Sequence, residues 1–173
     1  METLTERKGI VTAKGKPVTL VGPELKKGDK APDFRILDTE LNEKTLKDFS
    51  GTVKLISVTP SLDTSVCNRQ ARTFDARTED LGIAVLNVSM DLPFALERFV
   101  QEAHPVRLKA FSDHREASFG TAYGVLMKEL RLLARSVFVV DKDDVIRYVQ
   151  IVPEMTDDPD FRAAMEALRP VSG

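Results

Sequence analysis

The sequence predicts an α/β protein in which helices flank both faces of a central mixed β-sheet. The first observation is the order of its regular segments, which alternate strand and helix through the middle of the chain and close with a β-hairpin and a helix. The second is the length of 173 residues, from which we expect one domain spanning residues 1–173. The third is the composition, because 42% hydrophobic and 30% charged residues are typical of a globular chain.

The N-terminal part predicts a β-hairpin followed by irregular structure. Residues 10–21 place β-branched residues on both sides of a KGKP turn, where Gly15 can adopt the positive φ that a tight turn needs. We therefore expect an N-terminal hairpin over 10–21. The alternation in 34–38 predicts a strand, and 39–51 predict a turn, a short strand or helical turn, and a loop.

The rest of the chain predicts the sheet and its covering helices. Runs of β-branched and apolar residues predict strands at 53–59, 83–89, 108–113, 136–140 and 145–151. Apolar residues at helical spacing predict helices from Thr64 onward and at 92–103, 117–124 and 156–169. Acidic residues in the first turn of the last helix would suit the helix dipole. Residues 125–134 show no clear pattern.

Charge and hydropathy argue against nucleic-acid and membrane partners. The 25 Lys and Arg residues against 27 Asp and Glu residues give a net charge of −2, without the basic footprint that nucleic-acid binding needs. The longest mostly apolar stretches are far shorter than the roughly 20 residues that span a bilayer. The N-terminal segment lacks the apolar core of a secretory signal, so we expect a cytoplasmic protein.

Cys67 is the one cysteine in the chain, so no disulfide can form within it. The two histidines, His104 and His114, lie in polar contexts and are too few for a zinc site of the Cys/His type. We therefore expect neither a metal nor another cofactor. In the cytoplasm Cys67 would be kept reduced.

Cys67 is the main candidate for chemistry. Taken alone, a single cysteine is more often a small buried hydrophobic residue than a nucleophile. Its predicted place in the first turn of a helix after a strand favours a nucleophile, because free backbone N–H groups and the helix dipole stabilise a thiolate. Asp63 or Thr64 would cap this helix. Ala71 and Phe74 share the helix face of Cys67 and would partly shield it.

The surroundings of Cys67 narrow the chemistry. Position 70 is Gln70, so the C-x-x-C dithiol site is absent, and no histidine lies nearby in the sequence. The pattern Pro60-x-x-x-Thr64-x-x-Cys67 at a strand-to-helix turn resembles the active-site motif of the peroxiredoxins. The longer run TPSLDTSVCNRQARTFD is similar to their thiol peroxidase (Tpx-type) subfamily. Further blocks that resemble this subfamily lie before and after this run, over nearly the whole chain: KPVTLVG, GDKAPDF, SMDLPFALERF, YGV and LLARSVFVVD.

The resemblance implies a thioredoxin-like fold and a role for each matching residue. Cys67 matches the peroxidatic cysteine, whose thiolate attacks a hydroperoxide and becomes a sulfenic acid. Thr64 matches the threonine that hydrogen-bonds the thiolate and the peroxide, and Pro60 the proline that shields the cysteine from water. Arg135 matches the arginine that pairs with the thiolate and the peroxide oxygens. Without the resemblance, Thr64 would be a helix cap and Arg135 a surface or ion-pairing arginine.

One position departs from the subfamily. Tpx-type proteins carry a resolving cysteine where this chain has Val100, and no other cysteine replaces it. The resemblance therefore implies a one-cysteine mechanism, in which an external thiol (thioredoxin, glutaredoxin or a small thiol) or Cys67 of a second molecule reduces the sulfenic acid. It also implies hydrogen peroxide and organic or lipid hydroperoxides as substrates, and a homodimer.

Two other functions remain open from the sequence. The first is a peroxide-responsive redox sensor or thiol-exchange binding protein with little turnover, which the missing resolving cysteine favours. The second is an inert thioredoxin-like scaffold. For five further residues the sequence leaves two roles open, lining a substrate or dimer surface near Cys67 or packing in the core: Met90, Phe94, Phe99, Tyr123 and Met127. Core packing is favoured for Phe94 and Phe99.

Overall fold

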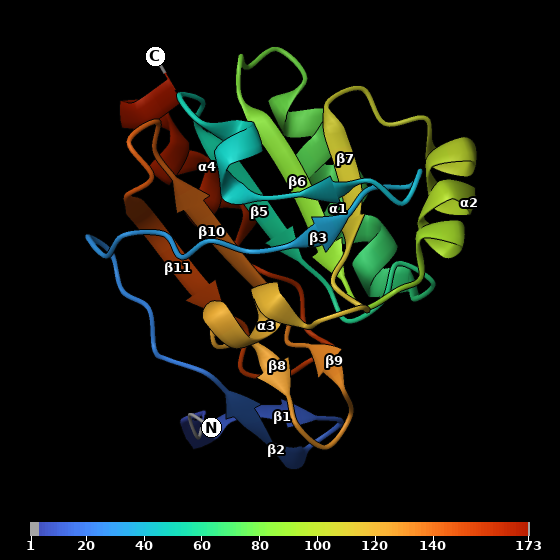
Figure 1. Ribbon diagram of the computed structural model, residues 1–173, viewed down its shortest axis with the longest axis vertical. Helices are drawn as coiled ribbons and strands as arrows, with labels where there is room; N and C mark the ends of the chain where they lie inside the picture. The colour runs from blue at the N-terminus through green and yellow to red at the C-terminus, as the bar shows by residue number, and fades with distance from the viewer. Residues whose placement is uncertain (1–3, 173) are drawn as a thin grey trace.

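The computed structural model describes residues 4–172, which form one large and one small β-sheet (Figure 1). The large sheet has seven strands, in the spatial order β11 (Ile146–Ile151), β10 (Ser136–Val140), β5 (Lys54–Val58), β6 (Ala84–Ser89), β7 (Leu108–Ser112), β3 (Ile36–Leu37) and β4 (Glu43–Lys44). Strands β5, β6 and β7 are parallel, and the other neighbours are antiparallel. The predicted mixed sheet is confirmed.

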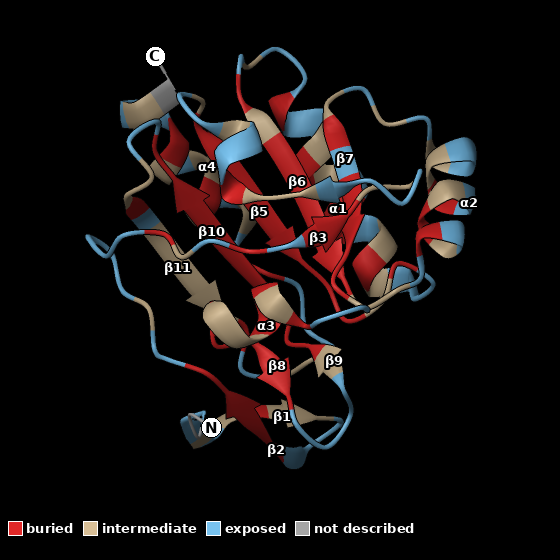
Figure 2. Cartoon of the chain, in the orientation of Figure 1, coloured by how far each residue is buried: buried red, intermediate tan, exposed pale blue. Residues whose placement is uncertain are grey.

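Helices cover both faces of this sheet. One face packs against α1 (Ser65–Thr78), α2 (Pro93–Ala103) and α4 (Phe161–Ser172), and the other against the 3-10 helix η1 (Leu46–Phe49) and α3 (Ser118–Ala122). Consecutive strand residues point to opposite faces, so Leu55 enters the core under α1 and α4 while Ile56 enters the core with Phe34 and Phe119. Every residue of β5 and β10 is consequently buried (Figure 2), which explains their nearly continuous apolar runs.

The small sheet joins the chain's start to a segment without a clear sequence pattern. Its order is β1 (Glu6–Ala13), β2 (Lys16–Val21), β8 (Leu126–Met127) and β9 (Leu132–Leu133). The predicted N-terminal hairpin is present, although its first strand begins at Glu6 rather than at residue 10. The strands β8 and β9 were not predicted, because two-residue strands are too short for periodicity to reveal.

The last helix begins later than predicted. It starts at Phe161 instead of 156, so its first turn holds no acidic residue, and that expectation was wrong. The acidic residues precede the helix instead. Among them, Asp160 accepts a hydrogen bond from the backbone N–H of Ala163 at 2.9 Å, which satisfies one of the free amides at the helix start.

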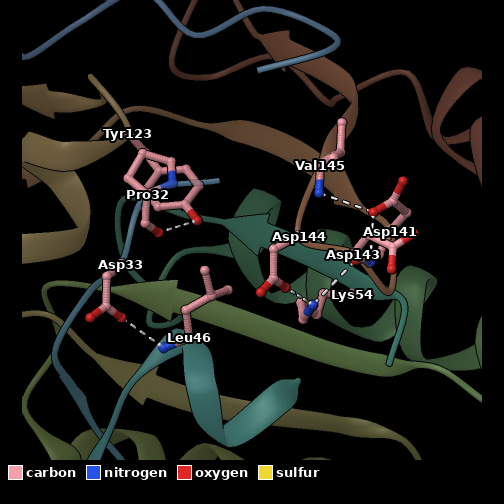
Figure 3. Close-up of polar contacts among 9 residues, drawn as sticks. All are labelled: Pro32, Asp33, Leu46, Lys54, Tyr123, Asp141, Asp143, Asp144 and Val145. Carbon is pink, nitrogen blue, oxygen red and sulfur yellow. Dashed lines mark hydrogen bonds and ion pairs between the residues drawn. The ribbon is translucent and has the colours of Figure 1, made fainter. Parts of the chain in front are cut away.

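Polar contacts close the amino-terminal end of β5 (Figure 3). Lys54, the first residue of β5, is fully buried and forms an ion pair with the carboxylate of Asp144. Its ammonium group also donates to the carbonyl oxygen of Asp141 at 3.3 Å. Nearby, the Tyr123 hydroxyl donates to the Pro32 carbonyl oxygen at 2.8 Å. Residues with sequence-predicted chemistry lie at the opposite, carboxyl-terminal end of this strand.

Candidate active site

The candidate site begins in the turn between β5 and α1. Thr64 has an extended backbone and is the N-cap of α1; its hydroxyl oxygen accepts the N–H of Cys67 at 3.4 Å. The same hydroxyl donates to the Ser61 carbonyl oxygen at 3.1 Å. Of the two caps left open by the sequence, Thr64 is the one that the fold uses. Cys67 therefore lies in the first turn, where backbone N–H groups stabilise negative charge on the sulfur.

Asp91 holds this turn in place, a role that the sequence did not reveal. Its carboxylate accepts from the Ser61 hydroxyl at 2.7 Å, from the Leu62 N–H at 2.8 Å and from the Ser89 hydroxyl at 2.9 Å. The contact arises because β5 and β6 are parallel, so the loops that leave their carboxyl ends are neighbours. The signal available in the sequence was an acidic residue two positions after the strand predicted at 83–89.

Cys67 is fully buried, in a core that also contains Ala71 and Phe74 of α1 together with Leu62 and Leu96. The predicted shared face of Cys67, Ala71 and Phe74 is confirmed. A sulfur in this position is shielded from bulk water while remaining one turn from the helix start.

Arg135 reaches Cys67 from the start of the neighbouring strand β10. It directly precedes β10, whose first residue Ser136 pairs with Val58 at the end of β5, so the fold brings Arg135 beside the turn before α1. One guanidinium nitrogen, Nη2, donates to Cys67 Sγ at 3.2 Å. Arg135 is only 2% exposed, so the surface position considered for it is wrong.

The other two guanidinium nitrogens of Arg135 also have partners. Nη1 donates to Gln70 Oε1 at 2.8 Å, and Nε donates to the Met155 carbonyl oxygen at 3.0 Å. Within residues 4–172, no carboxylate forms an ion pair with this guanidinium, whereas the exposed Arg69 pairs with Asp158 at 2.9 Å. The guanidinium of Arg135 thus contacts only neutral oxygens and the sulfur, so no carboxylate competes with the sulfur for its positive charge.

The other sequence candidates divide between core and surface. Pro60 is buried directly before the turn, and Val100 is half-buried on α2 against the core that contains Cys67. Phe99 is buried, as favoured, but Phe94 is 69% exposed, so core packing was wrong for Phe94. Leu92, at the start of α2, is 52% exposed beside it.

Metal-ligating clusters and membrane-spanning helices are both absent from the described residues. Among residues 4–172 no group of three or more His, Cys, Asp or Glu side chains has an arrangement that could hold a metal ion. No helix in the same range is long and apolar enough to span a membrane. The chemistry available here is that of one thiol, one guanidinium, a hydroxyl and backbone N–H groups.

Comparisons with known proteins identify relatives of this chain. The Redoxin family model matches residues 26–167. A thiol peroxidase of Halalkalibacterium halodurans is 51% identical over 160 residues, covering 92% of this chain and 96% of that protein. A thiol peroxidase of Listeria innocua is 52% identical and covers 92% and 97%, respectively.

A solved structure extends the similarity to three dimensions. A peroxiredoxin-like protein from Aquifex aeolicus superposes with a TM-score of 0.85 at 38% identity, over 96% of this chain and 98% of that one. These matches confirm both the resemblance inferred from the cysteine motif and the thioredoxin-like fold. The chain belongs to the redoxin family and, within it, to the thiol peroxidases, the Tpx-type peroxiredoxins.

Proposed function

We propose that this protein is a thiol-dependent peroxidase that reduces hydrogen peroxide and organic or lipid hydroperoxides through Cys67 by a one-cysteine mechanism. The observation that carries the proposal is the contact of 3.2 Å between the buried Arg135 guanidinium and Cys67 Sγ in the first turn of α1. Thiol peroxidases about half identical to this chain support the same activity.

The first half-reaction is a displacement at oxygen. The Cys67 thiolate attacks the distal oxygen of the hydroperoxide, an S–O bond forms and the O–O bond breaks. The leaving hydroxide or alkoxide takes up a proton and departs as water or alcohol, and Cys67 becomes a sulfenic acid. Arg135 stabilises the charge that develops on the leaving oxygen, and the Thr64 hydroxyl assists once its hydrogen turns from the Ser61 carbonyl oxygen toward the peroxide. Pro60 keeps water away from the sulfur.

The second half-reaction regenerates the thiol without a second cysteine in the chain. An external thiol attacks the sulfenic sulfur and releases water, which leaves a mixed disulfide on Cys67. A second thiol then attacks the external sulfur of this mixed disulfide. This step releases the Cys67 thiol and joins the two external thiols in a disulfide. Thioredoxin, glutaredoxin and small thiols are the candidate reductants. This need for a thiol pool supports a cytoplasmic location.

We also propose a homodimer. The exposed Leu92 and Phe94 lie at the start of α2, next to Asp91, whose carboxylate holds the turn before Cys67. Adjacent exposed apolar side chains of this size are typical of protein–protein contacts. Their position would place a second copy close to the site.

A redox sensor with little turnover is the second candidate function. The specific observation that favours it is the single cysteine in 173 residues, because no internal thiol can clear the sulfenic acid. Steady-state turnover separates the two functions. A peroxidase consumes many equivalents of peroxide in excess thiol, whereas a sensor stalls after one.

The decisive experiment treats the reduced protein with one equivalent of cumene hydroperoxide and no thiol, followed by intact mass spectrometry. Mass is the suitable readout because the chain has no tryptophan for fluorescence. We expect a gain of one oxygen within seconds, or a covalent dimer through Cys67, and neither product in Cys67→Ser. An unmodified native protein after minutes would contradict the proposal.

A further inference from the structure

A buried chain of hydrogen bonds runs away from the site, behind Arg135. Arg135 Nη1 donates to Gln70 Oε1 on α1, and Gln70 Nε2 donates to the Ser57 hydroxyl on β5 at 2.9 Å. The Ser57 hydroxyl donates to Asn87 Oδ1 on the neighbouring strand β6 at 3.2 Å. Asn87 Nδ2 in turn donates to the Thr59 hydroxyl at 3.1 Å. These contacts connect α1, two parallel strands and the segment before β10.

The members of this chain are sealed from water. Ser57, Thr59, Gln70 and Asn87 are all 0% exposed, so each polar atom depends on its protein partner. A buried polar group left without a partner loses its contacts with water and gains none in return, and this cost fixes the arrangement once it forms. Such a set of four neutral polar residues within an apolar sheet and helix interface requires a reason.

Arginine gives the chain a direction. A guanidinium can only donate, so Gln70 must present its oxygen to Arg135 and its NH2 group to Ser57. The Ser57 oxygen accepts from Gln70, and its hydrogen is left for Asn87 Oδ1. Each acceptor end therefore points back toward Arg135, and these aligned dipoles stabilise its charge and reinforce one another.

The chain stabilises the cation without neutralising it. No carboxylate in the described residues pairs with Arg135, so neutral dipoles hold the guanidinium and leave its full charge for the sulfur and the peroxide. Gln70 Nε2 also donates to the Val58 carbonyl oxygen at 3.3 Å, which anchors the amide to the strand end. A carboxylate at position 70 would instead form an ion pair with the same guanidinium.

We propose that Gln70, Ser57 and Asn87 are positioning residues for the peroxide reaction: they act through Arg135 by fixing where its Nη2 atom points and by keeping its charge uncompensated. We name this set the positioning chain. The inference rests on the proposed function. Its remotest member, Asn87, lies on a different strand from the catalytic turn and touches neither Cys67 nor Arg135 within the described contacts.

The experiment compares two reactions of the same thiol. Peroxide reduction needs Arg135 to stabilise a leaving oxygen, whereas alkylation by iodoacetamide releases iodide and needs no such help. The ratio of the two second-order rate constants, measured by rapid quenching and intact mass, therefore reports on Arg135 rather than on the exposure of Cys67. Far-UV circular dichroism and urea midpoints monitor folding of each variant.

The control variant is Thr78→Val. Thr78 is also fully buried on α1, but its hydroxyl donates only to backbone carbonyl oxygens, of Phe74 at 2.7 Å and of Asp75 at 3.3 Å. It lies outside the positioning chain. We expect it to lower stability and to leave the ratio unchanged.

The chain variants should lower the ratio of peroxide to iodoacetamide rate. Because a displacement of about 1 Å in a reacting geometry costs about 10²-fold, we expect a loss of about 10²-fold in Gln70→Glu and about 10-fold in Asn87→Ala. Ser57→Ala removes the donor to Asn87 and also the acceptor of Gln70 Nε2, so its loss should be at least that of Asn87→Ala, and it keeps the test usable if one variant fails to fold.

The outcomes separate this inference from the proposed function. A ratio that stays at the native value in folded Gln70→Glu, Asn87→Ala and Ser57→Ala overturns the positioning chain and leaves the peroxidase intact. A native Cys67 that does not react with peroxide overturns the proposed function, and the positioning chain with it.

Discussion

At the scale of single residues, the site combines a thiol with one unpaired cation. Arg135 is almost fully buried, and its planar guanidinium makes three separate hydrogen bonds, from Nε to the Met155 carbonyl oxygen, from Nη1 to Gln70 and from Nη2 to Cys67 Sγ, so each nitrogen has a partner. Lysine is a single point charge on a flexible stem and cannot span these partners. The guanidinium geometry, and not only its charge, belongs to the proposed mechanism.

Replacing Arg135 tests this role. Arg135→Ala should slow sulfenic acid formation by about 10²–10³-fold, by analogy with the loss of one oxyanion-stabilising donor. Arg135→Lys should recover only part of the loss, because it restores charge without the three-way fit. The measurement is the rate of oxygen addition to Cys67 by intact mass, and an unchanged rate in Arg135→Ala would return this residue to a structural role.

Asp113 predicts a pH dependence of stability away from the site. Its buried carboxylate accepts the N–H groups of Phe119 at 3.0 Å and Gly120 at 2.8 Å in α3, and burial raises its pKa to about 6. Between its ordinary pKa of about 3.8 and this value, the folded protein holds a proton that the unfolded chain does not. The contribution of Asp113 to stability is therefore greater at pH 5 than at pH 7, by about 1 kcal/mol.

Chemical denaturation of the native protein and Asp113→Asn at both pH values measures this contribution. The native protein should show an extra gain in unfolding free energy on going from pH 7 to pH 5. The asparagine variant should lack that gain and be less stable at pH 5, because its NH2 group faces a backbone donor. Parallel pH profiles of the two proteins would show that Asp113 does not titrate in this range.

At the scale of elements, the sequence predicts long segments well and short ones poorly. The helix α1, a cap at Asp63 or Thr64 and the buried strand β5 follow from apolar spacing and a cap residue, which are local signals, and the fold then selects Thr64. The strands β8 and β9 are two residues each and exist only because β8 pairs with β2 and β9 pairs with β8. Their formation depends on tertiary pairing, which no local pattern encodes.

The same distinction applies to the candidate site. Cys67, Thr64 and Pro60 lie within eight positions of one another, so a motif could join them. The contacts of Arg135 with Gln70 span 65 positions, and Asn87 is 30 positions from Ser57. These pairs meet only because β10 and β6 flank β5 in the sheet, so spacing alone could not identify Gln70 or Asn87.

The strand β5 carries the next prediction, at its end away from the site. Lys54 is fully buried and paired with Asp144, whose side chain is 30% exposed. Removing one partner of a buried ion pair costs about 3–5 kcal/mol, so Lys54→Ala should lower the unfolding free energy by this order. Lys54→Met should cost less, because it fills the space and Asp144 can regain contact with water. Urea unfolding followed by circular dichroism measures both, and equal losses would contradict this account.

At the scale of the whole molecule, one segment links the small sheet to the site. The Pro153 carbonyl oxygen accepts the N–H of Thr12 in β1 at 2.7 Å, and the Met155 N–H donates back to Thr12 at 2.9 Å. Met155 also supplies the carbonyl oxygen that holds Arg135 Nε. The N-terminal hairpin and the Arg135 guanidinium thus both form hydrogen bonds with the same short stretch of chain, residues 153–155.

Glu154, in the middle of this stretch, is the residue on which the linkage can be tested. Its carboxylate accepts from the Thr12 hydroxyl at 3.0 Å, the Gly15 N–H at 2.8 Å and the Thr156 N–H at 2.7 Å. These hydrogen bonds, above all those from Thr156, lower its pKa to about 2 from an ordinary value of 4.5. A carboxyl group with a lowered folded-state pKa stabilises the folded form above pH 4.5, and this contribution is lost as the pH falls toward 2.

Removing the charge of Glu154 should therefore destabilise the N-terminal hairpin locally and leave the large sheet intact. We expect Glu154→Gln to speed amide hydrogen exchange at the turn between β1 and β2, since one amide oxygen cannot accept what two carboxylate oxygens accept. Exchange in β5 and β6 should stay at the native rate, because their amides are buried within the seven-stranded sheet. Peroxide reactivity of Cys67 should fall only if the loosening reaches Met155 and through it Arg135. Hydrogen exchange with mass spectrometry, run beside the oxidation rate, measures both, and unchanged exchange at Gly15 would show that Glu154 does not hold the hairpin to the rest of the molecule.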